Sequence, residues 1–321
     1  MSEIEIPPQA DRVLLSVNPL AGASSAHQRA LHLAALLDDA GLAAEIHTDL
    51  DEVAARAAEY HAQGRLRALV AVGGDGTISE LANRTPPGLP IAVLPAGTEN
   101  LLARHFELPR QPEAIAQVIR QGKLLRVDAG RAGDRVFLVM LSCGFDAAVV
   151  HDFHGRRTGH ISKLGYFSSI LGSLARYSFP EIRVYWDEED RCGSTIRREL
   201  AARWVFAFNL PRYGGGLRIA PQADPSDGSL DVCTLRGAGL WHGLRYAAMI
   251  YLGRHQRSPD WTMFRARRLR ITAGEPVPCQ VDGDPAGTLP LDVEVLPGRL
   301  TLVVSNQTAG KVSPLNGGLN A

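Results

Sequence analysis

The chain has 321 residues, enough for about two domains, and 45% of them are hydrophobic, so a sizeable buried core is expected. Lysine plus arginine total 34, and so do aspartate plus glutamate, which leaves no global field to favour nucleic acid or an anionic membrane. The N-terminus has no signal-peptide pattern, and no apolar run reaches the ~20 residues of a membrane span. We therefore expect a cytoplasmic protein, at most peripheral at the inner membrane face, with no nucleic-acid partner.

The first 125 residues alternate apolar strand patterns with helical ones. The expected strands are 13–17, 43–48, 67–72 and 91–98, and the expected helices are 24–41 and 49–64, ending near Gly41 and Gly64. Strands that alternate with helices of this length pair in parallel through right-handed crossovers. The pattern predicts a doubly wound, Rossmann-like sheet.

After about residue 125 the rhythm changes to short strand patterns bounded by Gly, Pro, Asp and Asn. They are RVFLVMLS (135–142), RWVFAFNL (203–210), SLDVCTL (229–235), RLRITA (268–273), LDVEVL (291–296) and RLTLVVS (299–305). Such segments are typical of an antiparallel sandwich or barrel.

The stretch AVGGDGTISE (71–80) places three glycines and one aspartate between a strand and a helix. Thr77 and Glu80 have the spacing of a capping box, which predicts a helix that begins at Thr77. A glycine-rich turn before a helix lets phosphate oxygens approach backbone N–H groups, although a plain tight turn explains the local sequence as well. Similar loops follow two other strands, at 18–22 and 94–100, and favour a nucleotide site. Neither a Walker A loop nor a G-x-G-x-x-G fingerprint occurs.

Six motifs now stand in order along the chain: VNPLAG, GGDGTISELAN, LPAGTEN, GFDAAVV, APQADPSDGSLDV and QVDGD, between residues 17 and 284. Together they resemble the diacylglycerol kinase catalytic-domain superfamily, in particular bacterial soluble lipid kinases, which are similar to sphingosine and ceramide kinases. The resemblance implies a Rossmann-like N-terminal domain (1–127), an antiparallel β-sandwich lipid-substrate domain (128–302), and an active site in the cleft between them. The C-terminal tail (303–321) is expected to pack back on the first domain.

The resemblance also implies where ATP binds. The residues implied to contact the nucleotide are Gly73, Gly74, Asp75, Gly76 and Thr77 of the loop, with Asn18, Thr48, Thr98 and Asn100. From the residues alone, Asn18 with Pro19 is equally a simple turn, and Thr48 and Asn100 are equally capping residues.

Transfer of a phosphoryl group to an alcohol requires a base for the hydroxyl proton. The family base lies in a D-G-E motif, and VDGD matches it with Asp284 in the glutamate position. Asp75 is the alternative base, or it helps to hold a catalytic Mg²⁺ through water. An ordinary Asp-Gly hairpin turn would explain the local sequence around Asp284 as well.

A second, structural Mg²⁺ is implied in the β-domain. By position, its ligands are the side chains of Asp224 and Asp227 and the carbonyl of Ser229. Hard oxygen ligands suit magnesium, although an Asp-Gly turn is the simpler explanation of these residues.

Three residues depart from the family pattern: Glu99 replaces a glycine, Leu101 an aspartate and Asp284 a glutamate. They leave two other functions open, an NAD kinase-like enzyme and a descendant that binds nucleotide or lipid without catalysis. The expected partners are ATP and a lipid alcohol, whose identity no short motif gives. A dimer is compatible with the sequence, and the arginine-rich FRARRLR (264–270) is either a membrane contact or a solvated strand face.

Overall fold

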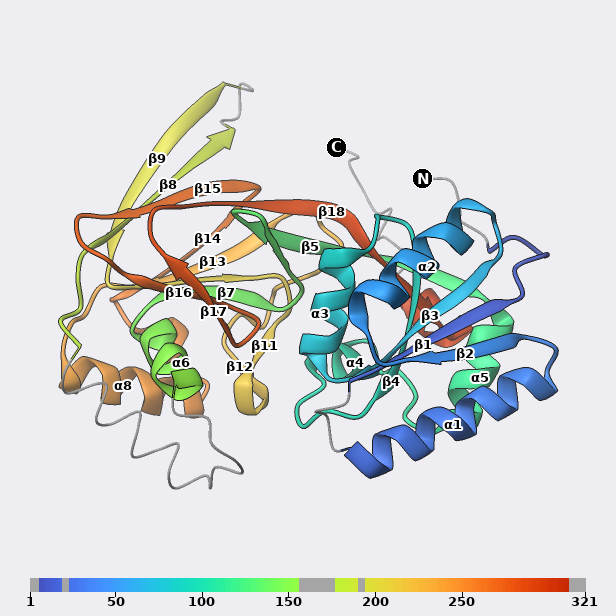
Figure 1. Ribbon diagram of the computed structural model, residues 1–321. Helices are drawn as coiled ribbons and strands as arrows, with labels where there is room; N and C mark the ends of the chain where they lie inside the picture. Colours follow the sequence, from blue (N-terminus) through green and yellow to red (C-terminus); the bar gives the residue numbers. More distant parts are fainter. Residues whose placement is uncertain (1–5, 19–22, 156–176, 190–193, 312–321) are drawn as a thin grey trace. The chain divides into compact units, whose positions relative to one another are not determined.

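The computed structural model describes residues 6–18, 23–155, 177–189 and 194–311 (Figure 1). Its packing divides the chain into two units, one made of Met1–Asp128 and Pro297–Ala321 and the other of Ala129–Leu296. Two strands, β5 (Lys123–Ala132) and β18 (Leu291–Val304), pass from one unit into the other. Within the described ranges, no helix has both the length and the apolar character needed to cross a membrane.

The first unit is built on a parallel sheet with the strand order β2-β1-β3-β4-β18. Besides β5 and β18, the described elements of this unit are β1 (Arg12–Val17), α1 (Ala23–Asp39), β2 (Ala43–His47), α2 (Leu50–Ala62), β3 (Leu66–Gly73), α3 (Asp75–Arg84), β4 (Pro90–Pro95), α4 (Leu101–His105), α5 (Pro112–Gln121) and α9 (Asn306–Lys311). The expected doubly wound fold is confirmed. The strand order reverses between β1 and β3, and in such sheets ligands bind beyond the carboxyl ends of the strands at this point.

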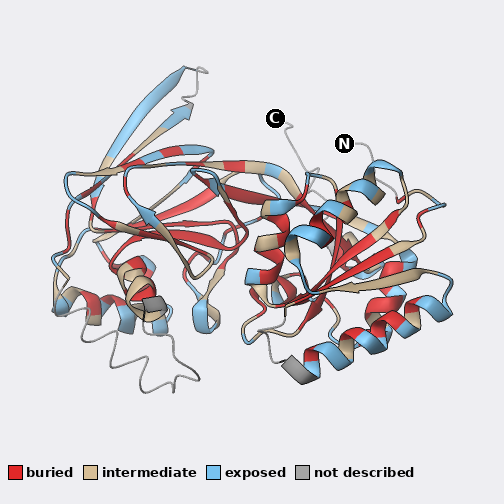
Figure 2. Cartoon of the chain, viewed as in Figure 1, coloured by how far each residue is buried: buried red, intermediate tan, exposed pale blue. Residues whose placement is uncertain are grey.

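Successive side chains of each strand point to opposite faces of the sheet, and on both faces they pack against helices. Val13, Leu15 and Val17 of β1 belong to a core that also contains the apolar stripes of α1 and α5. Helices α2 and α3 cover the other face, and Figure 2 shows the strands between the layers as largely buried. This two-sided burial explains why the strands are continuous apolar runs in the sequence.

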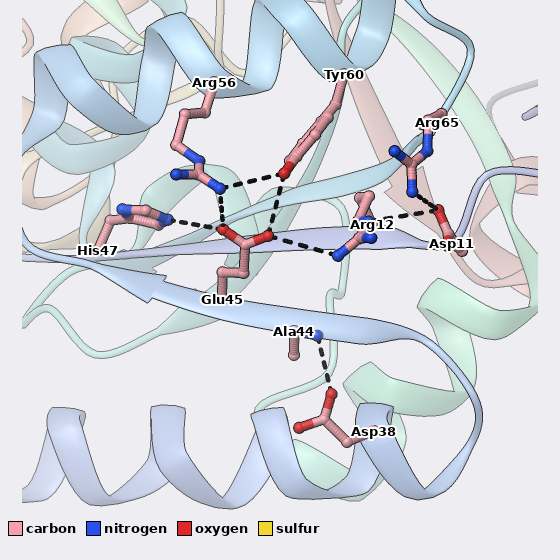
Figure 3. Close-up of polar contacts among 9 residues, drawn as sticks. All are labelled: Asp11, Arg12, Asp38, Ala44, Glu45, His47, Arg56, Tyr60 and Arg65. Atoms are coloured by element: carbon pink, nitrogen blue, oxygen red, sulfur yellow. Dashed lines mark hydrogen bonds and ion pairs between the residues drawn. The ribbon is translucent and has the colours of Figure 1, made fainter.

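A polar cluster fixes the edge strand β2 to helix α2 (Figure 3). Glu45 of β2 accepts hydrogen bonds from Arg56 at 2.7 Å and from the Tyr60 hydroxyl at 3.2 Å. His47 lies 3.5 Å from Glu45 and 3.3 Å from Glu52 of α2. The end of β2, which leads directly into Thr48, is therefore held in place by side chains rather than by a second neighbouring strand.

The predicted helix ends need small corrections in this unit. The helix expected over 24–41 spans Ala23–Asp39, and Gly41 adopts a φ of 80° in the turn that follows. The helix expected over 49–64 spans Leu50–Ala62, because the Asp49 side chain accepts the backbone N–H groups of Asp51 and Glu52, both at 2.9 Å. Thr48 is consequently not the cap of α2.

The second unit is an antiparallel β-sandwich. One sheet has the order β14-β13-β10-β7-β16-β17, and the other contains β15, β8 and β9 beside the first half of β18, with β5 paired to β6. The strands are β6 (Arg135–Phe137), β7 (Met140–Gly144), β8 (Ile182–Glu189), β9 (Thr195–Ala202), β10 (Trp204–Phe208), β11 (Arg212–Tyr213), β12 (Leu217–Arg218), β13 (Leu230–Leu235), β14 (Trp261–Ala266), β15 (Arg268–Ala273), β16 (Pro278–Val281) and β17 (Asp284–Thr288). The helices among the described residues of this unit are α6 (Phe145–Gly155), α8 (Leu240–Tyr251) and two short 3-10 turns, Gly214–Gly216 and His255–Arg257. Apolar side chains from both sheets form one buried core.

The predicted strand over 135–142 is wrong in one respect, because the structure divides it into β6 and β7. The backbone N–H groups of Leu138 and Val139 donate to the carboxylate of Asp282, at 2.7 and 2.8 Å, instead of to a neighbouring strand. A third N–H, from Met140, donates to the same carboxylate at 3.0 Å. The interruption is therefore caused by a side chain about 140 residues further along the chain.

Candidate active site

The first glycine loop leads from β3 into α3 without a linker. Gly73 ends the strand, Gly74 is the N-cap, and the helix begins at Asp75, two residues before the predicted start at Thr77. Thr77 is buried inside the first turn, and its N–H donates to the carbonyl of Gly74 at 3.1 Å. The capping-box interpretation is therefore wrong. A Cβ on Gly73 would lie 2.1 Å from Oγ1 of Thr77, so the close turn requires glycine there.

The second glycine loop, between β4 and α4, packs directly against the first. A Cβ on Gly97 would lie 2.6 Å from Cα of Gly74, and the N–H of Ala96 donates to the carbonyl of Gly73 at 2.9 Å. Asn100 closes this loop, because its side chain accepts the N–H of Gly97 at 3.1 Å and donates to the carbonyl of Gly97 at 2.7 Å. Its own φ of 47° is a left-handed conformation that asparagine tolerates. Asn100 therefore shapes the loop and makes no side-chain cap of α4.

The carboxylate of Asp75 joins the two loops. Its two oxygens accept the first backbone N–H groups of α4, from Leu101 at 2.8 Å and from Leu102 at 2.9 Å. Burial raises the pKa of Asp75, and these N–H donors act in the opposite direction by stabilising the anion. The side chain of Leu101 is itself buried, so the position where the family has an aspartate contributes a core contact and a backbone donor.

Gly76 differs from the other glycines of these loops. Among the described residues, a Cβ at this position would meet no atom within 4 Å, and its backbone φ is not in the left-handed region. Nothing in the packing of the described residues therefore requires glycine at this exposed site in the first turn of α3. A helix N-terminus with open space beside it can accept an anionic oxygen close to the backbone.

The remaining residues that are predicted to contact the nucleotide lie at the edges of these loops. Thr48 is exposed directly after β2, and Thr98 is exposed in the second loop. Asn18 directly follows β1, and the loop residues 19–22 after it lie outside the described residues. Glu99, the unusual acid of the second loop, lies 3.9 Å from Arg104 of α4, which offsets part of its negative charge.

In the second unit, the VDGD motif forms the tight hairpin between β16 and β17. Asp282 and Gly283 have φ values of 51° and 91°, and Val281 pairs with Asp284. The two positive φ values are those of a type I′ turn. Asp284 is 39% exposed and pairs with Arg135 at 3.1 Å. The two acids of the motif thus differ, because Asp282 serves the backbone and Asp284 keeps an accessible carboxylate.

A buried polar cluster supports this hairpin. Gln280 accepts the N–H of Gly283 at 2.9 Å and donates to Oγ of Ser142 at 2.9 Å and to Asp146 at 3.2 Å. Asp146, in the first turn of α6, also accepts hydrogen bonds from the hydroxyl groups of Ser142 at 2.6 Å and Tyr213 at 3.0 Å. Burial raises the pKa of Asp146, and the three donors lower it.

The acidic turn before β13 contains the implied metal ligands. Asp224 accepts the N–H of Ser226 at 3.0 Å, and Asp227 accepts the N–H of Ser229 at 3.0 Å. Arg265 lies 3.1 Å from Asp227 and 3.6 Å from Asp231. Burial raises the pKa of Asp231, and the positive charge of Arg265 acts in the opposite direction. Within the part of the chain that the structure describes, no three Asp, Glu, His or Cys side chains form a metal-binding group.

Four functional candidates in the second unit are absent from the sequence-based site. They are Arg135, Asp231, Gln280 and Asp282. Asp231, Gln280 and Asp282 lie inside the motifs quoted above, so their acidic or amide side chains could have been recognised as site candidates from the sequence. Nothing in the sequence around Arg135 indicates a site residue, because its partner Asp284 lies 149 residues away.

Comparison with known proteins finds two family models, which match consecutive parts of the chain. Residues 12–132 match the family model of the diacylglycerol kinase catalytic domain, and residues 139–304 match the YegS C-terminal NAD kinase beta sandwich-like domain. The chain is 29% identical over 245 residues to a diacylglycerol kinase of Mycobacterium tuberculosis, which covers 74% of this chain and 76% of that protein. It is 24% identical over 304 residues to a diacylglycerol kinase of Bacillus subtilis, which covers 93% and 98%.

Solved structures show the same fold at lower identity. A diacylglycerol kinase from Bacillus anthracis superposes with a TM-score of 0.63 at 18% identity, covering 93% of this chain and 98% of that one. An NAD kinase from Archaeoglobus fulgidus, solved in complex with ATP, gives a TM-score of 0.52 at 12% identity, covering 94% and 96%. At such identities the likeness concerns the fold alone.

Proposed function

The chain belongs to the diacylglycerol kinase catalytic-domain family with a YegS-type C-terminal domain, and on this premise we propose that it is an ATP-dependent lipid kinase. It transfers the γ-phosphate of ATP to a hydroxyl group of a diacylglycerol-like or sphingoid-like lipid. Its curated relatives are named diacylglycerol kinases, which supports a lipid alcohol as acceptor.

The observation that carries the nucleotide part of the proposal is the pair of interlocked glycine loops with open space at Gly76. Gly74 and Gly97 are glycines because the loops touch, and Gly73 because the turn brings it close to Thr77, whereas Gly76 leaves room that the described residues do not fill. Phosphate oxygens bind well to N–H groups at such a helix N-terminus. We assign ATP phosphates to this loop, with Asn18, Thr48 and Thr98 as further contacts at the same edge of the sheet.

We assign the role of base to Asp284. The attacking hydroxyl must lose its proton as it bonds to phosphorus, and a carboxylate with an accessible oxygen can accept that proton. Asp284 is partly exposed at a tight hairpin, where its carboxylate pairs with Arg135. Asp75 is a poorer choice because both of its oxygens already accept backbone N–H groups. Its proposed role is to hold the two loops together.

We also propose a structural Mg²⁺ at the acidic turn, held by Asp224, Asp227 and the carbonyl of Ser229. Hard oxygen donors suit this ion, and two carboxylates with one carbonyl do not require a group of three acids. One oxygen of the buried Asp231 has no hydrogen-bond partner among the described residues, which is the environment that a nearby cation would relieve. When bound, the ion would neutralise the clustered carboxylates of this turn.

Labelled ATP tests the proposed function directly. The protein is incubated with Mg²⁺ and either a mixed lipid extract or NAD, and label is expected in the lipid fraction. Label in NADP instead would favour the NAD kinase-like alternative. If neither acceptor is labelled although ATP raises the melting temperature, the protein binds the nucleotide without transfer.

Asp284→Asn tests the assigned base. The variant should lose transfer while it retains ATP binding. Asp292→Asn is the matched control, because Asp292 is also an exposed carboxylate paired with an arginine, Arg270, in the same unit. Unchanged turnover of Asp284→Asn would remove Asp284 from this role.

A further inference from the structure

Helix α8 turns an apolar face toward solvent. Among the described residues, six large hydrophobic side chains are exposed, and four of them belong to this helix or to the residue after it: Leu240, Trp241, Tyr251 and Leu252. Trp241 is 80% exposed and Tyr251 is 82% exposed. Only Gly243 and Tyr246 of the helix are buried (Figure 2).

Helical periodicity places these exposed residues on one stripe. Leu240, Leu244, Ala247 and Tyr251 recur at intervals of three and four residues, and Trp241 and Ala248 lie beside them. The opposite side, with Gly243 and Tyr246, faces the protein. A surface helix of a globular protein normally shows the reverse arrangement, with its polar side outward. The exposed stripe therefore has the character of a contact surface.

The chain segment that contains this stripe carries arginines and no acidic residue. Residues 236–257 contain four arginines, at positions 236, 245, 254 and 257, and no aspartate or glutamate. Arg245 lies 3.3 Å from Asp260. Arg236, Arg254 and Arg257 are exposed, and no carboxylate in the described ranges forms an ion pair with any of them.

The sequence left the arginine-rich segment FRARRLR (264–270) open as either a membrane contact or a solvated strand face. It spans the end of β14 and the start of β15, and most of its arginines are paired with acids. Arg270 pairs with Asp292 at 2.9 Å, Arg268 lies 3.4 Å from Glu294, and Arg265 lies 3.1 Å from Asp227. Three of its four arginines are thus paired with acids on neighbouring strands and turns, as on a solvated sheet face. They offer less net charge to an anionic surface than the arginines around α8.

We propose that α8 is the surface by which this protein docks on anionic lipid bilayers. Interfacial helices combine an apolar face containing Trp and Leu with basic residues that attract anionic headgroups. Trp and Tyr rings favour the boundary between headgroups and acyl chains, and each arginine near such a surface adds to the attraction. The inference rests on the proposed lipid kinase function, because an enzyme with a bilayer-resident substrate needs such a surface.

Vesicle binding tests the proposal without ATP or turnover. The full chain is sedimented with vesicles of phosphatidylcholine containing phosphatidylglycerol, and with vesicles of phosphatidylcholine alone. The wild type should bind the anionic vesicles. Trp241→Ala should weaken binding about tenfold, and Arg254→Glu by at least about fivefold at low salt. Matched controls are Leu31→Ala, which alters an exposed leucine (51%) of α1, and Arg268→Glu on the rival strand, where the arginine side chain is 83% exposed. Both should bind as the wild type does.

A fluorescence measurement covers the case in which a variant is unstable. Brominated lipid in the vesicles should quench part of the wild-type tryptophan emission, and Trp241→Phe should remove that quenchable part while the other three tryptophans remain. Wild-type protein that does not bind anionic vesicles, or Trp241→Ala that binds normally, overturns the proposal. So does a dimer that Trp241→Ala dissociates without any vesicle binding, since the stripe would then be a contact between two copies.

Failure of docking and failure of the kinase function give different results. Phosphorylation of a water-soluble short-chain diacylglycerol should be the same in the wild type and in Trp241→Ala, whereas phosphorylation of vesicle-bound lipid should fall with the variant's binding. If no lipid is phosphorylated while binding still depends on Trp241, docking holds and the kinase proposal is wrong.

Discussion

Replacing Asp75 by asparagine separates its role as a clamp between the glycine loops from a role as base. The carboxylate accepts two N–H groups, at 2.8 and 2.9 Å. Asparagine keeps one acceptor oxygen and turns an NH2 group toward the other N–H. Losing one charge-assisted hydrogen bond costs about 1.5–3 kcal/mol, and the favourable charge at the start of α4 adds about 0.3–1 kcal/mol. Relief of the burial that raises the pKa of Asp75 offsets part of this loss.

The expected net loss for Asp75→Asn is about 2 kcal/mol in the free energy of unfolding, or about 4–8 °C in melting temperature. If Asp75 clamps the loops, KM for ATP should rise about tenfold. If Asp75 were the base, kcat would fall by about 10²–10⁴ with little change in KM for ATP. Thermal melting and steady-state kinetics with varied ATP distinguish these results.

Asp49→Asn is the matched control for this prediction. Asp49 also accepts two backbone N–H groups at a helix start on the same sheet edge, but it caps its own helix, α2. Asparagine is an equally good N-cap, so this variant should change neither stability nor KM appreciably. An Asp75→Asn protein that melts like the wild type and loses only kcat would refute the clamp.

Three further predictions concern single sites. Gly76→Ala should stabilise the fold by about 0.5–1 kcal/mol, as measured by thermal melting, yet weaken ATP binding, as measured by calorimetry. The control is Gly274→Ala, at another exposed glycine with open space among the described residues, which should leave ATP binding unchanged. Equal ATP affinity of the two variants would contradict a phosphate role for Gly76. Asp284→Asn should lower kcat by about 10²–10⁴ and change stability by less than about 1 kcal/mol, because its ion pair is partly exposed. Because burial raises the pKa of Asp146, the stability that this carboxyl contributes is greatest below its unfolded pKa of about 3.9 and is lost as pH rises through its folded pKa. Denaturant unfolding between about pH 4 and pH 8 should therefore show the wild type losing stability relative to Asp146→Asn as pH rises, and a constant difference would contradict the raised pKa.

The sequence predicted those parts of the molecule that depend on local pattern. The apolar runs of β1, β3 and β4 and the helical stripe of α1 give the parallel sheet directly, because both faces of the strands are buried. The glycine spacing of residues 73–76 likewise predicted a loop where backbone is accessible. The sequence places both loops at one edge of the sheet, but it does not show that Gly74 and Gly97 come into contact there.

The errors arise where a side chain acts across a long distance in sequence. The capping box at Thr77 and Glu80 has the right spacing, yet Gly74 caps α3, and the acid beside it is used to cap a different helix. The run over 135–142 reads as one strand, because nothing within it shows that Asp282 will accept its N–H groups. The secondary-structure propensity of a segment does not indicate a hydrogen-bond acceptor, such as the Asp282 carboxylate, that comes from a distant part of the sequence.

The contacts of Asp75 also bear on the departure at Leu101. Asp75 binds the backbone N–H of residue 101, and a backbone N–H is available whichever side chain that residue carries. Replacement of an acidic residue by leucine therefore leaves the clamp intact, while the buried leucine side chain adds apolar contact beneath the loop. What the replacement removes is a carboxylate that could share a cation with Asp75. We therefore propose that the departure bears on metal use, whereas the contact of Asp75 with the second glycine loop does not depend on the side chain of residue 101.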